Sequence, residues 1–88
     1  MTNDELLGKL INTIDKTSLR GLVKSFCLVE RQEPETIYLV VLQKLQLGIL
    51  QKQENIRSVE EALSAILGRR VNASMRYQSK DEYFSSLL

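Results

Sequence analysis

The sequence predicts an α+β fold, a small domain in which helices pack on a three-stranded sheet. The pattern changes at Gly68, because residues 58–67 repeat their apolar side chains at helical spacing, whereas residues 70–77 alternate apolar and polar side chains. Residues 36–42 (TIYLVVL) are apolar on both faces, as in a central strand covered by helices. The chain has 88 residues, 43% of them hydrophobic and 26% charged, which suits one globular domain.

Two helices are expected before the sheet. Thr2 and Glu5 have capping-box spacing, and the apolar residues after them recur at helical intervals: Leu6, Leu7, Leu10, Ile11 and Ile14. Residues 15–18 interrupt this pattern. It restarts as a shorter helix that has Thr17 or Ser18 as its cap and carries the apolar residues Leu19, Leu22, Val23 and Phe26.

Residues 26–31 and 36–42 predict an antiparallel hairpin. Pro34 lies in the polar stretch between them, where it helps to turn the chain and blocks continuation of the strand. The segment 43–57 (QKLQLGILQKQENIR) follows neither the helical nor the strand period consistently. We expect a helical turn or loop over 43–52.

The helix at 58–67 is expected to begin with a capping box made by Ser58 and Glu61. It should end at Gly68, the residue type that enters the left-handed conformation without steric cost. Leu63 lies on its apolar face and should be among the most buried residues. The strand 70–77 must then return beside one of the hairpin strands.

A short C-terminal helical tail at 79–88 is expected to follow a domain that spans 1–78. Ser79 and Glu82 repeat the capping-box spacing. Two arrangements fit the tail: either it folds back over the open face of the sheet and completes the core, or it lays its apolar face into a groove of another protein. The residues of that face are the candidates for partner binding: Tyr83, Phe84, Leu87 and Leu88.

The residues that common enzyme chemistry needs are missing. The chain has no histidine, which removes the commonest general base and nearly every zinc site. No glycine-rich phosphate-binding motif occurs, and Cys27 lies in an apolar run that predicts a buried, unreactive thiol. The sequence therefore predicts a domain that is not an enzyme and has no cofactor or metal. Three acidic pairs fall at predicted helix starts, where the helix dipole explains them: Asp4/Glu5, Glu60/Glu61 and Asp81/Glu82.

Basic residues are concentrated in one segment although the net charge is only +1. Residues 67–80 contain Arg69, Arg70, Arg76 and Lys80 and no carboxylate. The three arginines are candidates for phosphate contacts. The competing interpretation is structural, because the first two follow a helix C-terminus, where cations are also stabilising. No two glycines are three residues apart, so the G-X-X-G loop with which KH modules grip single strands is absent, and sequence-specific binding is not expected.

The segments SLRGLVKSFCLVE, ETIYLVVL and ENIRSVEEALSAILGRRVNASM, in this order, resemble the C-terminal domain of tau-type subunits of bacterial DNA polymerase III. The counterparts of the family's pattern are Asn55, Arg57, residues 60–63, residues 67–69 and Val71. The chain departs from that pattern at Arg70, where the family usually has proline, and in QKLQLGILQKQ, where it usually has basic residues. The N-terminal domain of the replication initiator DnaA is similar in its order of elements.

The resemblance implies a KH-like α-α-β-β-α-β domain that lost the G-X-X-G loop. It implies a protein-protein docking function in the DNA replication machinery, with a polymerase or helicase subunit as the partner. The alternative is a degenerate KH-like domain that binds nucleic acid weakly and non-specifically through its basic residues. No signal peptide and no membrane-spanning apolar run is expected, so we predict a cytoplasmic protein that does not bind membranes.

Overall fold

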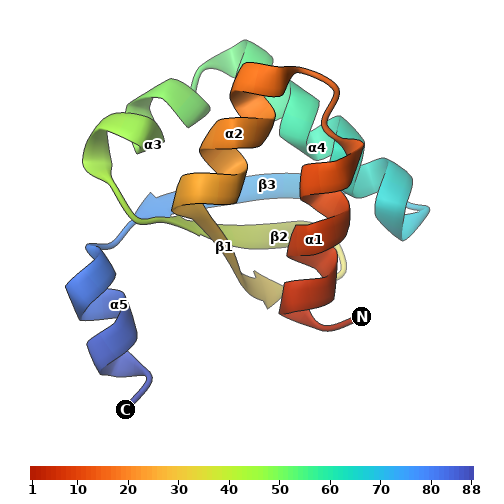
Figure 1. Cartoon of the computed structure of the whole chain (residues 1–88). Coiled ribbons are helices and arrows are strands. Elements are labelled where there is room, and N and C mark those ends of the chain that lie inside the picture. The colour runs from red at the N-terminus through yellow and green to blue at the C-terminus, as the bar shows by residue number, and fades with distance from the viewer.

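The computed structural model, which describes all 88 residues, confirms the α+β class (Figure 1). The order of the predicted elements is also observed, with one additional short helix, α3, between the hairpin and the long helix. None of the helices is both long enough and apolar enough to cross a lipid bilayer. The elements are α1 (Asn3–Thr13), α2 (Thr17–Phe26), β1 (Cys27–Gln32), β2 (Thr36–Val41), α3 (Lys44–Leu50), α4 (Gln53–Leu67), β3 (Asn72–Tyr77) and α5 (Lys80–Ser86).

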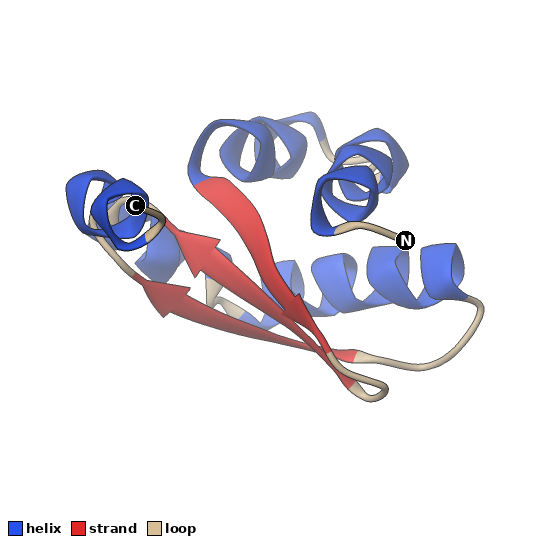
Figure 2. Ribbon diagram, turned by 90° about the horizontal axis from the view of Figure 1, so that it is seen from below, coloured by secondary structure: helices blue, strands red, loops and turns tan.

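The sheet has the strand order β1-β2-β3, with β2 in the centre as its sequence predicts. β1 and β2 form the expected antiparallel hairpin, which pairs Cys27 with Val41 and contains an irregularity between Val29 and Arg31. β3 returns beside β2 and runs parallel to it. A parallel neighbour requires a long connection, which α3 and α4 supply. Figure 2 shows the resulting sheet with β2 between the two edge strands.

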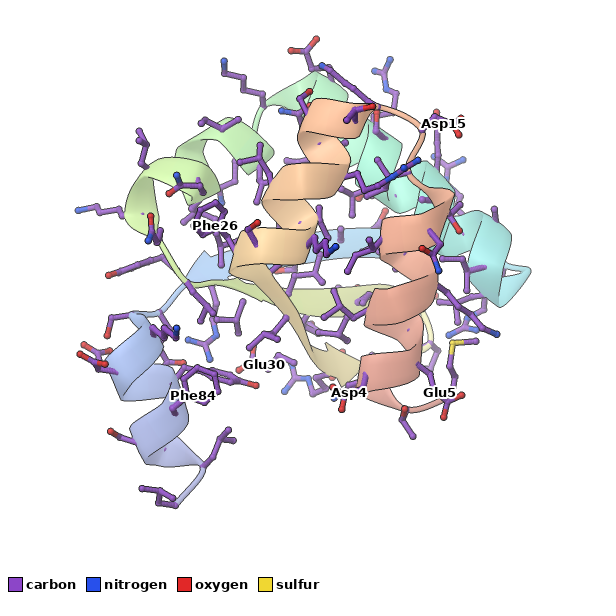
Figure 3. The ribbon with its side chains drawn as sticks, viewed as in Figure 1. Asp4, Glu5, Asp15, Phe26, Glu30 and Phe84 are labelled. Atoms are coloured by element: carbon purple, nitrogen blue, oxygen red, sulfur yellow. The ribbon has the colours of Figure 1, made fainter.

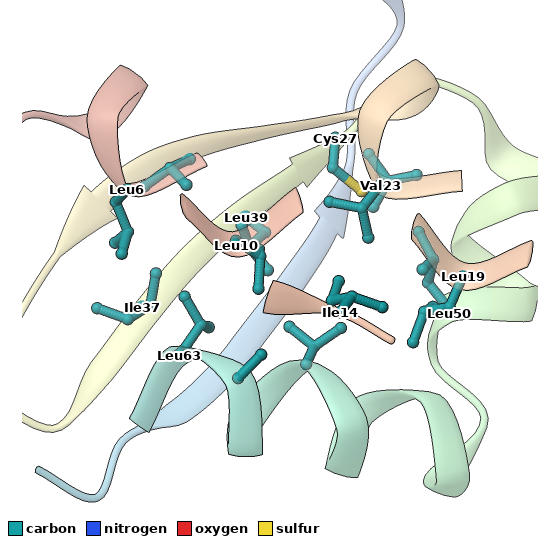
Figure 4. Close-up of a cluster of buried hydrophobic side chains, with 14 of the residues drawn as sticks. Leu6, Leu10, Ile14, Leu19, Val23, Cys27, Ile37, Leu39, Leu50 and Leu63 are labelled. Carbon is teal, nitrogen blue, oxygen red and sulfur yellow. The ribbon is translucent and has the colours of Figure 1, made fainter. Parts of the chain in front are cut away.

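The hydrophobic core lies on one face of the sheet (Figure 4). Ile37, Leu39 and Val41 alternate along β2 toward this face and are buried. Leu6 and Leu10 of α1 pack against it, and Leu63 of α4 is completely buried, as expected. The helices contribute their apolar stripes to one continuous cluster, whose other members are Ile14, Leu19, Val23, Cys27, Val29, Leu50, Val59, Ala62 and Val71.

Two expected helix starts are wrong. α4 begins at Gln53, five residues before the expected start at Ser58, whose hydroxyl lies inside the helix and donates to the Glu54 carbonyl at 3.0 Å. The earlier start is stabilised by the buried Asn55, whose amide donates to the Ile49 carbonyl at the end of α3 at 2.8 Å. A capping box at Ser58 and Glu61 therefore does not form. Of the two structures expected over 43–52, a helical turn or a loop, the structure has the helical one, α3.

α2 lacks the expected cap as well. Its N-cap is Lys16, without a side-chain hydrogen bond, so neither Thr17 nor Ser18 caps the helix. The connection between α1 and α2 is stabilised by Arg20 instead. Its guanidinium donates to the Ile14 carbonyl from Nε at 2.9 Å and from Nη2 at 2.7 Å. This side chain ties the end of α1 to the start of α2.

Three other predictions about where helices begin or end are confirmed. The Thr2 hydroxyl accepts from the Glu5 amide at the start of α1, and the Ser79 hydroxyl accepts from the Glu82 amide at the start of α5. Gly68 ends α4 in the left-handed conformation, with φ 68° and ψ 21°. β3 begins at Asn72, two residues later than the expected start at residue 70.

Candidate protein-docking surface

Helix α5 and the two residues after it place the predicted partner-binding residues away from the core. Besides its Ser79 cap, it has Asp81 and Glu82 in its first turn, where the helix dipole favours negative charge. In Figure 1 the helix extends from the end of β3 on the side of the sheet opposite to α2, and the chain ends beyond it. The local signals for a helix are thus strong even though none of its residues is buried.

The C-terminal apolar surface, as we name it, consists of Tyr83, Phe84, Leu87 and Leu88. The exposed fraction is 46% for Phe84 and 64% for Leu87, and Leu88 is fully exposed. Tyr83 is half-buried and meets Phe84 edge to face, with ring centroids 5.4 Å apart and an interplanar angle of 85°. Figure 3 shows Phe84 on α5, outside the body of the molecule.

This arrangement differs from the first of the two expected for the tail. No residue of α5 belongs to the core or packs against it, so the tail does not complete the core. The core is already closed by α1 to α4 on its one face of the sheet. The structure places Tyr83 and Phe84 on α5 and Leu87 and Leu88 directly after it, and three of these four candidate residues are exposed to solvent.

On the open face of the sheet, long polar side chains lie over the apolar residues of the central strand. Arg76 of β3 reaches over the central strand and binds Glu30 of β1 through its Nε, at 3.0 Å, and through its Nη2. Val40 of β2 is in register with Arg76 and is fully buried, yet it lies outside the core cluster. Toward the hairpin loop, the Arg31 guanidinium of β1 stacks 4.2 Å from the centre of the Tyr38 ring of β2.

The hydrogen bond from Arg76 lowers the pKa of the Glu30 carboxyl below its ordinary value of 4.5. The same contact raises the pKa of Arg76. Both side chains are partly exposed to water, which limits what the ion pair contributes to stability. Residues that lie 46 positions apart are nevertheless joined across the full width of the sheet.

Acidification is expected to weaken the fold in part through Glu30. A carboxyl group whose pKa is lowered by folding stabilises the fold above its unfolded pKa, and this contribution is lost as the pH falls through the folded pKa. The stability difference between the wild type and Glu30→Gln should therefore be present at about pH 6 and shrink at about pH 3. Urea unfolding at both pH values measures it. Glu61→Gln is the control, and an equal pH effect in both variants would contradict the prediction.

The three candidate phosphate-binding arginines are not brought together. Arg69 follows α4 and donates from Nε to the Pro34 carbonyl in the β1–β2 loop at 2.8 Å. Arg76 is engaged with Glu30 and also donates to the Gln78 side chain at 3.0 Å. Arg70 and Arg76 are six positions apart along β3 and its approach, which is roughly 20 Å in an extended chain. Each arginine thus has its own local surroundings.

A polar groove lies between α4 and the start of β3. Arg70 lines it together with Arg57, but so do Glu60 and Glu61, so the charges in it are mixed. Glu60 is already used, because its carboxylate accepts from the backbone amide of Ala73 at 2.9 Å. The groove offers no concentration of one charge that would attract a phosphate strongly.

No cluster of metal-ligating side chains occurs in the structure. Cys27 is buried at the start of β1 between α2 and the sheet, as its apolar neighbours predict. Burial raises the pKa of the Cys27 thiol to about 12, so the nucleophilic thiolate is not populated at neutral pH.

Two contacts that shape the surface were missed in the sequence. Neither the pairing of Glu30 with Arg76 nor the bond from Ala73 to Glu60 has a local signal, because each joins residues on different elements. Glu60 lies one helical turn before Ser64 and on the same side of α4. The Ser64 hydroxyl accepts from the Val71 amide at 3.0 Å. Both α4 side chains therefore face the start of β3.

A scan of protein-family models, a search of curated proteins and a search of solved structures each found no match to this chain.

Proposed function

We propose that this chain is a non-enzymatic docking domain that binds another protein through the C-terminal apolar surface. The observation that carries the proposal is the exposure of Phe84, Leu87 and Leu88, on and directly after a helix that has its own N-terminal cap and no role in the core. A contiguous set of exposed apolar side chains marks a surface that a partner can bury. The resemblance in sequence suggests a replication protein, a polymerase or helicase subunit, as that partner.

A helix-in-groove contact fits the spacing of these residues. Phe84 and Leu87 are three positions apart, and Leu87 is the C-cap of α5 in a right-handed helical conformation, so these two side chains share one side of the helix, and Leu88 follows them. Full burial of one such side chain contributes about 1.5–3 kcal/mol. The binding free energy from burying two of these side chains is large enough to decide whether the complex forms.

Replacing Phe84 and Leu87 together by Ser should abolish binding and leave the fold intact. Because α5 buries none of its residues, the melting temperature should stay close to that of the wild type. Binding to immobilised bacterial polymerase and helicase subunits should weaken at least a hundredfold, as expected for the loss of about 3 kcal/mol. Surface plasmon resonance measures the affinity, and thermal unfolding measures the stability.

The matched control is Asp81→Asn with Ser85→Ala, which changes two exposed polar residues of the same helix. It should bind like the wild type. Equal affinity of the Phe84→Ser, Leu87→Ser variant and the wild type would contradict the proposed surface. A large fall in its melting temperature would show that the tail supports the core after all.

Weak, non-specific nucleic-acid binding has less support, because Arg69 and Arg76 already have partners and lie toward opposite ends of β3. An isolated arginine contact predicts a slope of about −0.7 in a plot of log K against log salt for a single strand. A slope several times steeper, lost in an Arg69→Gln, Arg70→Gln, Arg76→Gln variant, would favour that alternative.

A further inference from the structure

Helix α5 is attached to the sheet by a short linker and packs on no part of the core. β3 ends at Tyr77 and α5 begins at Lys80, so the linker is the two residues Gln78 and Ser79. A terminal helix without a buried residue pivots about such a linker unless other contacts fix its direction. A partner would then have to order the helix as well as bury its side chains, which lowers the affinity.

Arg76 forms a contact with this linker. Its Nη2 donates to the side-chain oxygen of Gln78 at 3.0 Å, and Gln78 directly precedes Ser79, the cap of α5. The backbone amide of Gln78 donates to the Val41 carbonyl at 3.2 Å. The linker is therefore held to the sheet through its backbone and through a side chain.

Arg76 can fix the linker because it is itself held at two points. Its Nε donates to one oxygen of the Glu30 carboxylate at 3.0 Å, and its Nη2 donates to the other oxygen. A two-point contact of this kind fixes the plane of the guanidinium, whereas a lysine ammonium binds as a point charge. The Arg76 side chain thus connects β1 to the linker across the open face of the sheet.

Tyr83 lies near the same guanidinium. It is the only residue of α5 that is half-buried, although it lies outside the core cluster and the residues packed against it. The pKa of Arg76 is raised mainly by the hydrogen bond to Glu30 and in smaller part by the nearby Tyr83 phenol group. The first turns of α5 therefore lie close to Arg76 as well.

We propose that Arg76 is a positioning residue for the C-terminal apolar surface, because it holds α5 in a fixed direction relative to the sheet before a partner binds. Its consequence for binding rests on the docking function proposed above, whereas the fixed direction of α5 is a property of the free chain. The exposed ion pair with Glu30 contributes little to stability, so this role concerns the direction of the helix and not the fold.

The test measures backbone ¹⁵N relaxation of the free, whole chain. In the wild type the amides of α5 should have order parameters of about 0.85, like those of α4. In Arg76→Gln they should fall below about 0.6, while the chemical shifts of α5 stay helical and the melting temperature stays close to that of the wild type. Gln78→Ala keeps the Glu30 pair and the backbone bond to Val41, and it should also lower the order parameters of α5.

Arg31→Gln is the matched control. It removes another exposed guanidinium of the sheet that pairs with a carboxylate, Glu33, near the hairpin loop, and it should leave the order parameters of α5 unchanged. Arg76→Lys keeps the charge but not the two-point contact, so it should resemble Arg76→Gln. The proposal is overturned if α5 is already mobile in the wild type or if it stays rigid in Arg76→Gln.

Binding to immobilised polymerase and helicase subunits gives the second measurement. Arg76→Gln should bind about fivefold more weakly than the wild type, because the partner must then order α5. An unchanged affinity together with a mobile α5 would overturn the role of Arg76 in docking. A wild type that binds none of these subunits, with α5 rigid in it and mobile in Arg76→Gln, would contradict the docking function and support the fixed direction of α5.

Discussion

Leu63→Ala is expected to lower the free energy of unfolding by about 2–5 kcal/mol, which is the largest effect of a single substitution that we predict. Leu63 is completely buried where α4 crosses the sheet, among the side chains of α1 and β2. Removing its isobutyl group leaves a cavity that closely packed neighbours fill only in part. Urea or thermal unfolding of the purified domain measures the loss.

The control for this substitution is Leu45→Ala on α3. It removes the same group from a side chain whose exposed fraction is 73%, and it should change the free energy of unfolding by less than about 0.5 kcal/mol. Similar losses in both variants would mean that the apolar face of α4 is assigned incorrectly.

Gly68→Ala is expected to cost about 1–2 kcal/mol, because φ is 68° at this position and a β-carbon is unfavourable there. No atom lies within 4 Å of the place where that carbon would be, so the cost comes from the backbone conformation and not from a clash with a neighbour. The comparison is Gly68→Asn, since asparagine adopts the left-handed region more readily. It should be clearly more stable than Gly68→Ala in the same unfolding experiment. Equal stability of the two variants would contradict this account.

Local signals predicted most of the fold. The end of α4 at Gly68, the caps at Thr2 and Ser79 and the period of β2 each depend on a few neighbouring residues, and each was recognisable in the sequence. The start of α4 depends on contacts with another helix, through the Asn55 bond to the Ile49 carbonyl. A capping pattern at Ser58 was misleading for that reason.

The candidate surfaces were less predictable than the fold. The apolar residues of α5 could be identified as a group, but their exposure depends on how completely α1 to α4 cover the core. The separation of the arginines follows from the direction of β3 and from partners far away in the sequence, such as Pro34 and Glu30. Charge composition alone suggested a common patch because it contains no information about these partners.

The parallel pairing of β2 with β3 has a consequence for the order of folding. Thr36 and Asn72 are paired across 36 positions of chain (72 − 36), whereas the hairpin joins Gln32 to Ile37. Loop closure makes the longer pairing entropically more demanding, so we expect the hairpin to form with a local turn and β3 to join it when α4 folds back. Until β3 joins, one edge of the central strand is unprotected, and this strand contains the most β-prone segment of the chain, TIYLVVL.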